Sequence, residues 1–94
     1  MYIVLIDIEL KENTEELFKT WITESNGILS KFPGFISRKF VKSDSGKYEL
    51  VVEFIDKESH VNIHRTKEHD EIHKQLMSFL KKPPMPNFYH VISQ

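Results

Sequence analysis

The pattern of hydrophobic and polar positions divides the chain into short segments of two kinds. Apolar residues that recur every second position predict a strand, whereas recurrence every three or four positions predicts a helix. By this criterion we expect strands over residues 2–10, 35–42, 48–54 and 87–93. Helices are expected over residues 15–32, from Lys57 onward, and from Thr66 to Leu80. Between Tyr48 and Leu80 the spacing of the apolar residues changes from every second position to every third or fourth, so a strand is followed by helices.

Residues at the segment boundaries support these limits. Asn13 with Glu16 has the spacing of a capping box, and Asp56 is a short acceptor suited to cap the helix near Lys57. Residues 43–47 contain a glycine between two strand patterns and predict a hairpin connection. Residues 81–86 contain three prolines within four positions, which exclude a helix there.

The order of segments, β-α-β-β-α-β, is that of a ferredoxin-like α+β fold with a four-stranded antiparallel sheet. Residues 1–94 are expected to form one domain. The first strand is apolar on both faces in its first half, with Val4 and Ile6 on one side and Ile3 and Leu5 on the other. Helices cover only one face of such a sheet, so the other face predicts a partner. A homodimer in which two sheets pack face to face would bury it.

Composition and charge exclude several classes of function. The chain of 94 residues has no cysteine, which excludes thiol chemistry and disulfides. Its net charge is −1. Lysines and arginines are scattered, so the sequence predicts no nucleic-acid partner and no binding to a membrane. No apolar run approaches the roughly 20 residues that span a bilayer, and the first residues lack a basic leader. We therefore expect a cytoplasmic protein.

Several motifs together resemble the antibiotic-biosynthesis monooxygenase (ABM) domain. They are Leu29-Ser30-Lys31-Phe32-Pro33-Gly34-Phe35, the strand from Tyr48 to Phe54, Asp56-Lys57-Glu58 and His64-Arg65-Thr66-Lys67-Glu68-His69. The resemblance covers essentially the whole chain and implies a dimeric α+β barrel with a pocket between sheet and helices in each protomer. Members of this family include oxygenases of phenols and quinols that need no cofactor, haem-degrading oxygenases, and proteins with no established reaction.

Four of the five histidines lie between His60 and His73 and are the main candidates for chemistry. His60 and His64 are four residues apart, as are His69 and His73, so each pair can share one helix face. This is a spacing of metal ligands, but neither pair belongs to an H-E-x-x-H pattern with its general base. We expect no metal.

The resemblance places His64 and His69 at recurring histidine positions of the family. In an oxygenase, His64 would be the base that takes a phenolic proton, with Asp7 or Tyr48 nearby as a further donor or acceptor. The predicted lining of the pocket for a small aromatic molecule is Trp21, Phe54, His69 and His73. Two plainer interpretations stay open: the histidines hydrogen-bond a corner between helices, and Asp7 is a solvent-facing carboxylate.

The resemblance also leaves two other functions open. His73 matches the haem-ligating histidine of the haem-degrading branch of the family. That branch also has a tryptophan ten residues earlier, where this chain has Ile63, and an asparagine on the first strand, where it has Ile6 or Asp7. No cofactor is therefore the first expectation, and haem bound through His73 is the alternative. The third function is a non-catalytic dimer that binds a small molecule or acts in a stress response.

Overall fold

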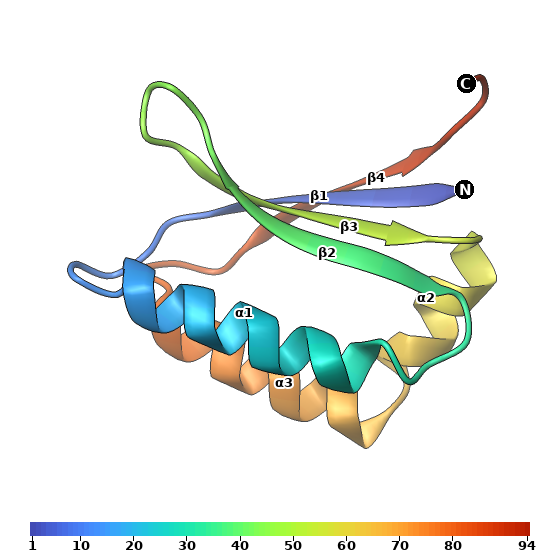
Figure 1. Cartoon of the computed structure of the whole chain (residues 1–94), viewed down its shortest axis with the longest axis horizontal. Coiled ribbons are helices and arrows are strands. Elements are labelled where there is room, and N and C mark those ends of the chain that lie inside the picture. The colour runs from blue at the N-terminus through green and yellow to red at the C-terminus, as the bar shows by residue number, and fades with distance from the viewer.

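The computed structural model describes all residues from Met1 to Gln94 and confirms the predicted fold class. Its elements follow the order β-α-β-β-α-α-β. They are β1 (Tyr2–Ile8), α1 (Glu15–Leu29), β2 (Phe35–Lys42), β3 (Tyr48–Phe54), α2 (Lys57–His64), α3 (Lys67–Phe79) and β4 (Met85–His90). The strands form one antiparallel sheet in the order β2-β3-β1-β4. Figure 1 shows α1 and α3 side by side beneath this sheet, with α2 at one end.

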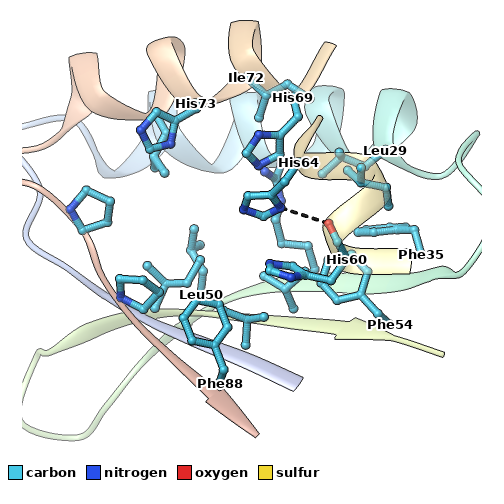
Figure 2. Close-up of a pocket in the computed structure, with 18 residues that line it drawn as sticks. Leu29, Phe35, Leu50, Phe54, His60, His64, His69, Ile72, His73 and Phe88 are labelled. Atoms are coloured by element: carbon cyan, nitrogen blue, oxygen red, sulfur yellow. Dashed lines mark hydrogen bonds between the residues drawn. The ribbon is translucent and has the colours of Figure 1, made fainter. Parts of the chain in front are cut away.

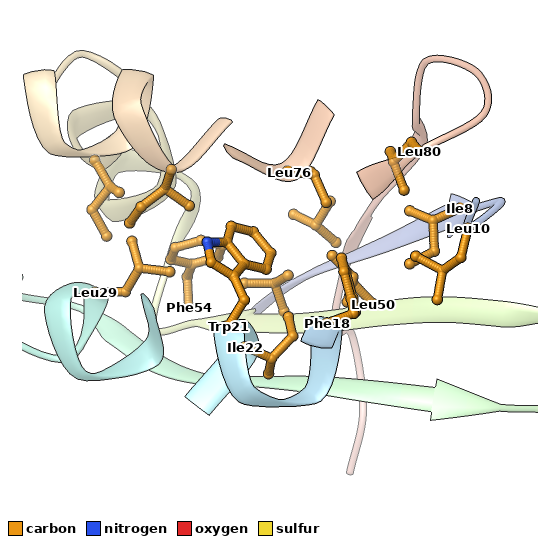
Figure 3. Close-up of a cluster of buried hydrophobic side chains, with 14 of the residues drawn as sticks. Ile8, Leu10, Phe18, Trp21, Ile22, Leu29, Leu50, Phe54, Leu76 and Leu80 are labelled. Carbon is orange, nitrogen blue, oxygen red and sulfur yellow. The ribbon is translucent and has the colours of Figure 1, made fainter. Parts of the chain in front are cut away.

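The core lies between the sheet and the two long helices. Phe18 of α1 is fully enclosed, and Leu50 of β3 is 1% exposed. The Phe18 ring makes edge contacts with Phe40 of β2, at 4.8 Å between ring centroids, and with Phe79 of α3, at 5.2 Å. Figure 3 shows how side chains from both helices and the sheet converge on this layer. Aromatic edge-to-face contacts of this kind add to the hydrophobic stabilisation that burial itself provides.

Two separate capping residues divide the segment after β3 into α2 and α3, as the sequence predicted. Asp56 Oδ1 accepts a hydrogen bond from the backbone N–H of Ser59 at 2.8 Å and begins α2. Thr66 Oγ1 accepts one from the N–H of His69 at 3.1 Å and begins α3. The chain therefore leaves the helical path at Arg65 and restarts it in a new direction.

The capping box predicted from Asn13 and Glu16 is wrong. Thr14, not Asn13, is the N-cap of α1, and its side chain makes no capping hydrogen bond. The Thr14 hydroxyl donates backward to the carbonyl oxygen of Lys11 at 2.7 Å, while Asn13 adopts a positive φ of 58°. Asn13 therefore belongs to a tight turn before α1 and does not cap the helix.

Three predicted boundaries also move. β1 ends at Ile8 rather than at residue 10, and α1 ends at Leu29 rather than at residue 32. The last strand covers Met85–His90 instead of residues 87–93, so it contains Pro86. Because β4 is an edge strand, a proline without a backbone N–H is tolerated there.

The face of the sheet turned away from the helices carries apolar side chains among charged ones. Ile3 and Leu5 of β1 are only half-buried, and they are flanked by Val51 of β3 and Tyr89 of β4. Tyr89 is 49% exposed, and every residue of β4 is exposed. This face has no covering layer in the single chain. None of the helices is long and apolar enough to cross a membrane.

Candidate active site

A cavity of about 140 Å³ lies between the inner face of the sheet and helices α2 and α3. Figure 2 shows His60, His64, His69 and His73 around this space, with Leu50 and Phe88 below them. Eleven of its 18 lining residues are hydrophobic, and none is acidic. The polar members are Arg38 and the four histidines, and the full lining is Val4, Ile6, Leu29, Phe35, Arg38, Leu50, Val52, Phe54, His60, Ile63, His64, His69, Ile72, His73, Leu76, Pro84, Pro86 and Phe88.

The break between α2 and α3 brings the histidines into one row. On a continuous helix, residues five apart would point about 140° away from each other. Because the helix restarts after Arg65, the rings of His64 and His69 lie only 3.9 Å apart between centroids. His60 stands 4.1 Å from His64 on the other side, and His73 lies 6.2 Å from His69. The predicted pairs therefore form a single row along the cavity.

The tautomer of His64 follows from its hydrogen bond. Nδ1 of His64 lies 3.1 Å from the backbone carbonyl oxygen of His60, shown as the dashed line in Figure 2. A carbonyl oxygen can only accept, so Nδ1 carries the hydrogen and Nε2 of the neutral ring has a free lone pair. A neutral imidazole held in this state is suited to accept a proton at Nε2.

The surroundings favour neutral imidazoles along the row. Burial, reinforced by the charges of neighbouring histidines, lowers the pKa of His69 to about 4. Burial, together with His64 and Lys57, also lowers the pKa of His60 to about 4. The pKa of His64 is lowered as well, mainly by the partial burial of a side chain that is still exposed at its edge, against the opposing effect of its hydrogen bond to the carbonyl of His60. At neutral pH these three rings are therefore uncharged.

His60 is the most enclosed of these histidines, at 9% exposed. Its ring lies among those of Tyr2, Phe54 and Phe88, at 5.4, 5.0 and 5.5 Å between centroids. Nδ1 of His60 is fully buried and has no hydrogen-bond partner. A buried polar atom without a partner destabilises the fold, so such atoms are uncommon in proteins.

Arg38 is a polar residue of the cavity that the sequence analysis did not single out. It lies in β2 and is 8% exposed. The register of β2 shifts between Phe35 and Ser37, so Phe35 and Arg38 both line the cavity although they are three residues apart. The sequence did contain a signal for Arg38, because it lies two residues from Phe40 and so shares one face of β2 with it. The β-bulge breaks this alternation of faces near Phe35 and obscures the signal.

Phe54, His69 and His73 of the predicted site line the same cavity as His64. Trp21, predicted as a further lining residue, lies in the core instead. Its Nε1 donates a hydrogen bond to Oε1 of Gln75 at 2.7 Å, which links α1 to α3. The hydrophobic residues around Trp21 are therefore those of the main core and not those of the pocket that the sequence analysis predicted for it.

The structure does not bring Asp7 or Tyr48 to His64. Asp7 is not among the cavity residues, and its carboxylate pairs with Lys47 at 3.3 Å. The hydroxyl of Tyr48 donates a hydrogen bond to Glu15 of α1, and this bond raises the pKa of the tyrosine. Tyr48 pairs with Ile8 at the end of β1, whereas the cavity histidines lie beyond the other end of β3, near Phe54. The predicted constellation of three residues is therefore not assembled.

The cavity lining lacks two usual features of a metal or haem site. No group of three or more His, Cys, Asp or Glu side chains is placed to hold a metal ion. The cavity of about 140 Å³ matches the volume of about 150 Å³ that holds a single benzene ring. Ile63, where the haem-degrading pattern has a tryptophan, is 3% exposed and belongs to the core.

Comparison with known proteins places this fold among the ABM proteins. No protein-family model matches the sequence, and no curated protein matches it. SnoaB, a cofactor-independent oxygenase from Streptomyces nogalater, superposes with a TM-score of 0.83 over 99% of this chain and 94% of its own, at 8% identity. A second structure described as an antibiotic biosynthesis monooxygenase has a TM-score of 0.78 over 99% of this chain and all of its own, at 9% identity. A conserved protein from Methanosarcina mazei has a TM-score of 0.79 over 95% of this chain and 91% of its own, at 18% identity.

These likenesses confirm the resemblance to the ABM domain at the level of the fold. Identities below 20% do not extend it to an activity.

Proposed function

We propose that this protein is an ABM-type monooxygenase that oxygenates a small phenol or quinol-like aromatic molecule without a bound cofactor. The proposed base is His64, and the proposed pocket is the cavity that it lines together with Phe54, His69 and His73. The hydrogen bond from Nδ1 of His64 to the carbonyl oxygen of His60 carries this proposal, because it leaves Nε2 free to accept a proton. The volume of the cavity supports a single aromatic ring as the substrate.

The proposed reaction needs only the substrate, molecular oxygen and a base. Nε2 of His64 takes the phenolic proton, and the electron-rich phenolate passes an electron to oxygen. The resulting radical pair forms a C–O bond at a ring carbon that carries hydrogen, and the imidazolium returns its proton to the peroxide. Loss of the ring proton and cleavage of the O–O bond then release water. One phenol and one O₂ thus give one quinone and one H₂O.

The cavity contributes to this reaction through its hydrophobic lining. Apolar side chains around the substrate ring lower the local dielectric, while His64 and His73 at the cavity keep contact with solvent. The neutral state of His60 and His69 also matters, because two further imidazolium groups would oppose protonation of His64.

Oxygen uptake with a panel of single-ring phenols and quinols tests the proposal. His64→Ala and His64→Gln are expected to lower the rate per folded protein by roughly 10²–10⁴-fold, since neither side chain accepts a proton. The rate of the unmodified protein is expected to rise with pH through a midpoint below about 6.5, because burial lowers the pKa of His64 from its ordinary value. His90→Ala is the matched control, since His90 is exposed on β4 and outside the cavity lining.

Two results would contradict a catalytic role for His64. The first is oxygen uptake that stays within threefold after His64→Ala. The second is a rate that rises with pH through a midpoint above about 6.5, the ordinary pKa of histidine. If the cavity binds aromatic ligands and no compound of the panel is consumed, the protein is a non-catalytic binding module.

A further inference from the structure

Arg38 is a buried cation with no anionic partner in the chain. Its guanidinium donates from Nε to Oδ1 of Asn26 at 2.7 Å, and from Nη2 to the carbonyl oxygen of Ile22 at 3.3 Å and to Oγ of Ser25. All three acceptors are neutral. Each of the six ion pairs in the structure has a lysine as its cation. Buried charges in proteins are normally paired, so an uncompensated guanidinium at 8% exposure requires an explanation.

One nitrogen of this guanidinium is free to bind a ligand. An arginine has five N–H donors, and Nη1, which carries two of them, makes no hydrogen bond here. Among the side-chain nitrogen and oxygen atoms, only Nδ1 of His60 is fully buried without a hydrogen-bond partner. Since Nη1 of Arg38 also has no partner, it is not fully buried and keeps some accessible surface. Arg38 is also one of the residues that line the cavity.

The guanidinium is fixed in place rather than mobile. Asn26 holds Arg38 from two sides, because its Oδ1 accepts from Nε and its Nδ2 donates to the backbone oxygen of Arg38 at 2.8 Å. The ring of Trp21 lies 5.1 Å from Cζ on a further side, as a cation–π contact. A charged donor that is already ordered loses little conformational entropy on binding a ligand.

The rest of the cavity offers nothing to neutralise this charge. No lining residue is acidic, and most of the surface is apolar. Arg38 therefore adds a positive charge to the lining of a hydrophobic space the size of one aromatic ring. A ligand complementary to both features has an aromatic body and a negatively charged oxygen.

We propose that the cavity selects a single-ring aromatic carboxylate, with its carboxylate oxygen bound by Nη1 of Arg38 and its ring among the hydrophobic side chains. This inference deepens the proposed function by giving the class of substrate, and its binding step does not depend on turnover. Arg38 is a ligand-binding residue in this proposal, and His64 stays free to act on a hydroxyl of the same ring.

Calorimetric titration with benzoate and its neutral isostere benzamide tests the proposal. Benzoate is expected to bind at least tenfold more tightly than benzamide, and Arg38→Gln is expected to remove this difference while benzamide binding changes little. Arg65→Gln is the matched control, because Arg65 is the other arginine of the chain and is exposed. It should retain the preference of the unmodified protein.

A second variant keeps the test decisive if Arg38→Gln does not fold. Asn26→Asp leaves the guanidinium in place and supplies an internal carboxylate next to Nε, so benzoate should bind at least tenfold more weakly. Equal binding of benzoate and benzamide by the unmodified protein would overturn the proposal. So would unchanged benzoate affinity in a folded Arg38→Gln or Asn26→Asp protein.

The same titration separates this proposal from the catalytic one. Benzoate has no phenolic hydroxyl, so its preference over benzamide is measured without any turnover and does not require the base. Benzoate selectivity without oxygen uptake on any phenol would reject the oxygenase and keep the ligand class. Oxygen uptake on neutral phenols without a preference for benzoate would reject the ligand class and keep the oxygenase.

Discussion

At the scale of single residues, His60 links the cavity to the stability of the fold. Its pKa of about 4 lies below the ordinary value of about 6.5, because its ring is enclosed by aromatic side chains. Between these two pH values the unfolded chain binds a proton at this residue and the folded chain does not. Protons therefore favour unfolding, and the stabilisation present above pH 6.5 is lost as the pH falls toward 4. His69, with a similarly lowered pKa, acts in the same direction.

His60→Phe is expected to make the stability less dependent on pH. Phenylalanine suits the contacts with Tyr2, Phe54 and Phe88, removes the unpartnered Nδ1 and does not titrate. The slope of the free energy of unfolding between pH 6.5 and 4 should decrease by at most about 1.4 kcal/mol per pH unit. Urea unfolding at several pH values and one protein concentration measures this slope. A slope identical to that of the unmodified protein would show that His60 is protonated equally in both states.

Sequence reasoning at this scale found the histidines but not the arginine. The histidines share a short segment, and capping residues at Asp56 and Thr66 showed where it would fold into two helices. Arg38 was missed because a β-bulge, which has no clear sequence signal here, changes which side chains of β2 share a face. Asp7 was assigned to the site because it interrupts an otherwise apolar strand, but this pattern does not tell which face of β1 the helices cover.

At the scale of elements, Gly34 sets how closely the start of β2 approaches α2. Its φ is +85°, and a Cβ atom at this position would overlap the side chain of Ser59 in the first turn of α2. The carbonyl oxygen of Gly34 also accepts a hydrogen bond from the N–H of Ile55 at 2.9 Å. Since α2 carries His60 and His64, this contact also positions one wall of the cavity.

Gly34→Ala is expected to destabilise the protein more than Gly46→Ala. Both glycines have a positive φ, which costs an alanine about 1–2 kcal/mol, but Gly46 has no atom within 4 Å of the added Cβ. The difference between the two variants, at least about 1 kcal/mol on this basis, isolates the overlap with Ser59. Urea unfolding gives both values. Equal destabilisation would mean that α2 can move without loss.

The elements themselves were largely predictable, because the period of the apolar residues differs clearly between strands and helices. Their ends were less so, as β4 shows. Three nearby prolines excluded a helix over residues 81–86, and the strand was predicted to begin only after them, yet an edge strand accommodates Pro86. Pairing with β1 decides where β4 lies, and the sequence of β4 alone does not contain that information.

At the scale of the whole molecule, the uncovered face of the sheet and the exposed strand β4 predict self-association. Light scattering or sedimentation at micromolar concentration is expected to give about twice the chain mass of 11.2 kDa. The physical reason is that a chain of this size has a limited core and leaves half-buried apolar residues on this face.

Val51→Lys should weaken that association, because Val51 lies on β3 in the middle of the outer face, opposite Leu5. Leu17→Lys is the control, since Leu17 is 66% exposed on α1, on the other side of the molecule. A folded unmodified protein with the mass of one chain would reject the dimer.

The position of Trp21 gives the molecule its own optical reporter. It is the only tryptophan, and its indole lies over the guanidinium of Arg38 while hydrogen-bonding Gln75 of α3. Fluorescence from an indole responds to the electric field of nearby charges, so a carboxylate arriving at Arg38 should shift the emission. Association and dissociation rate constants would then follow from stopped-flow mixing without any label, and the signal would come from one known place in the fold.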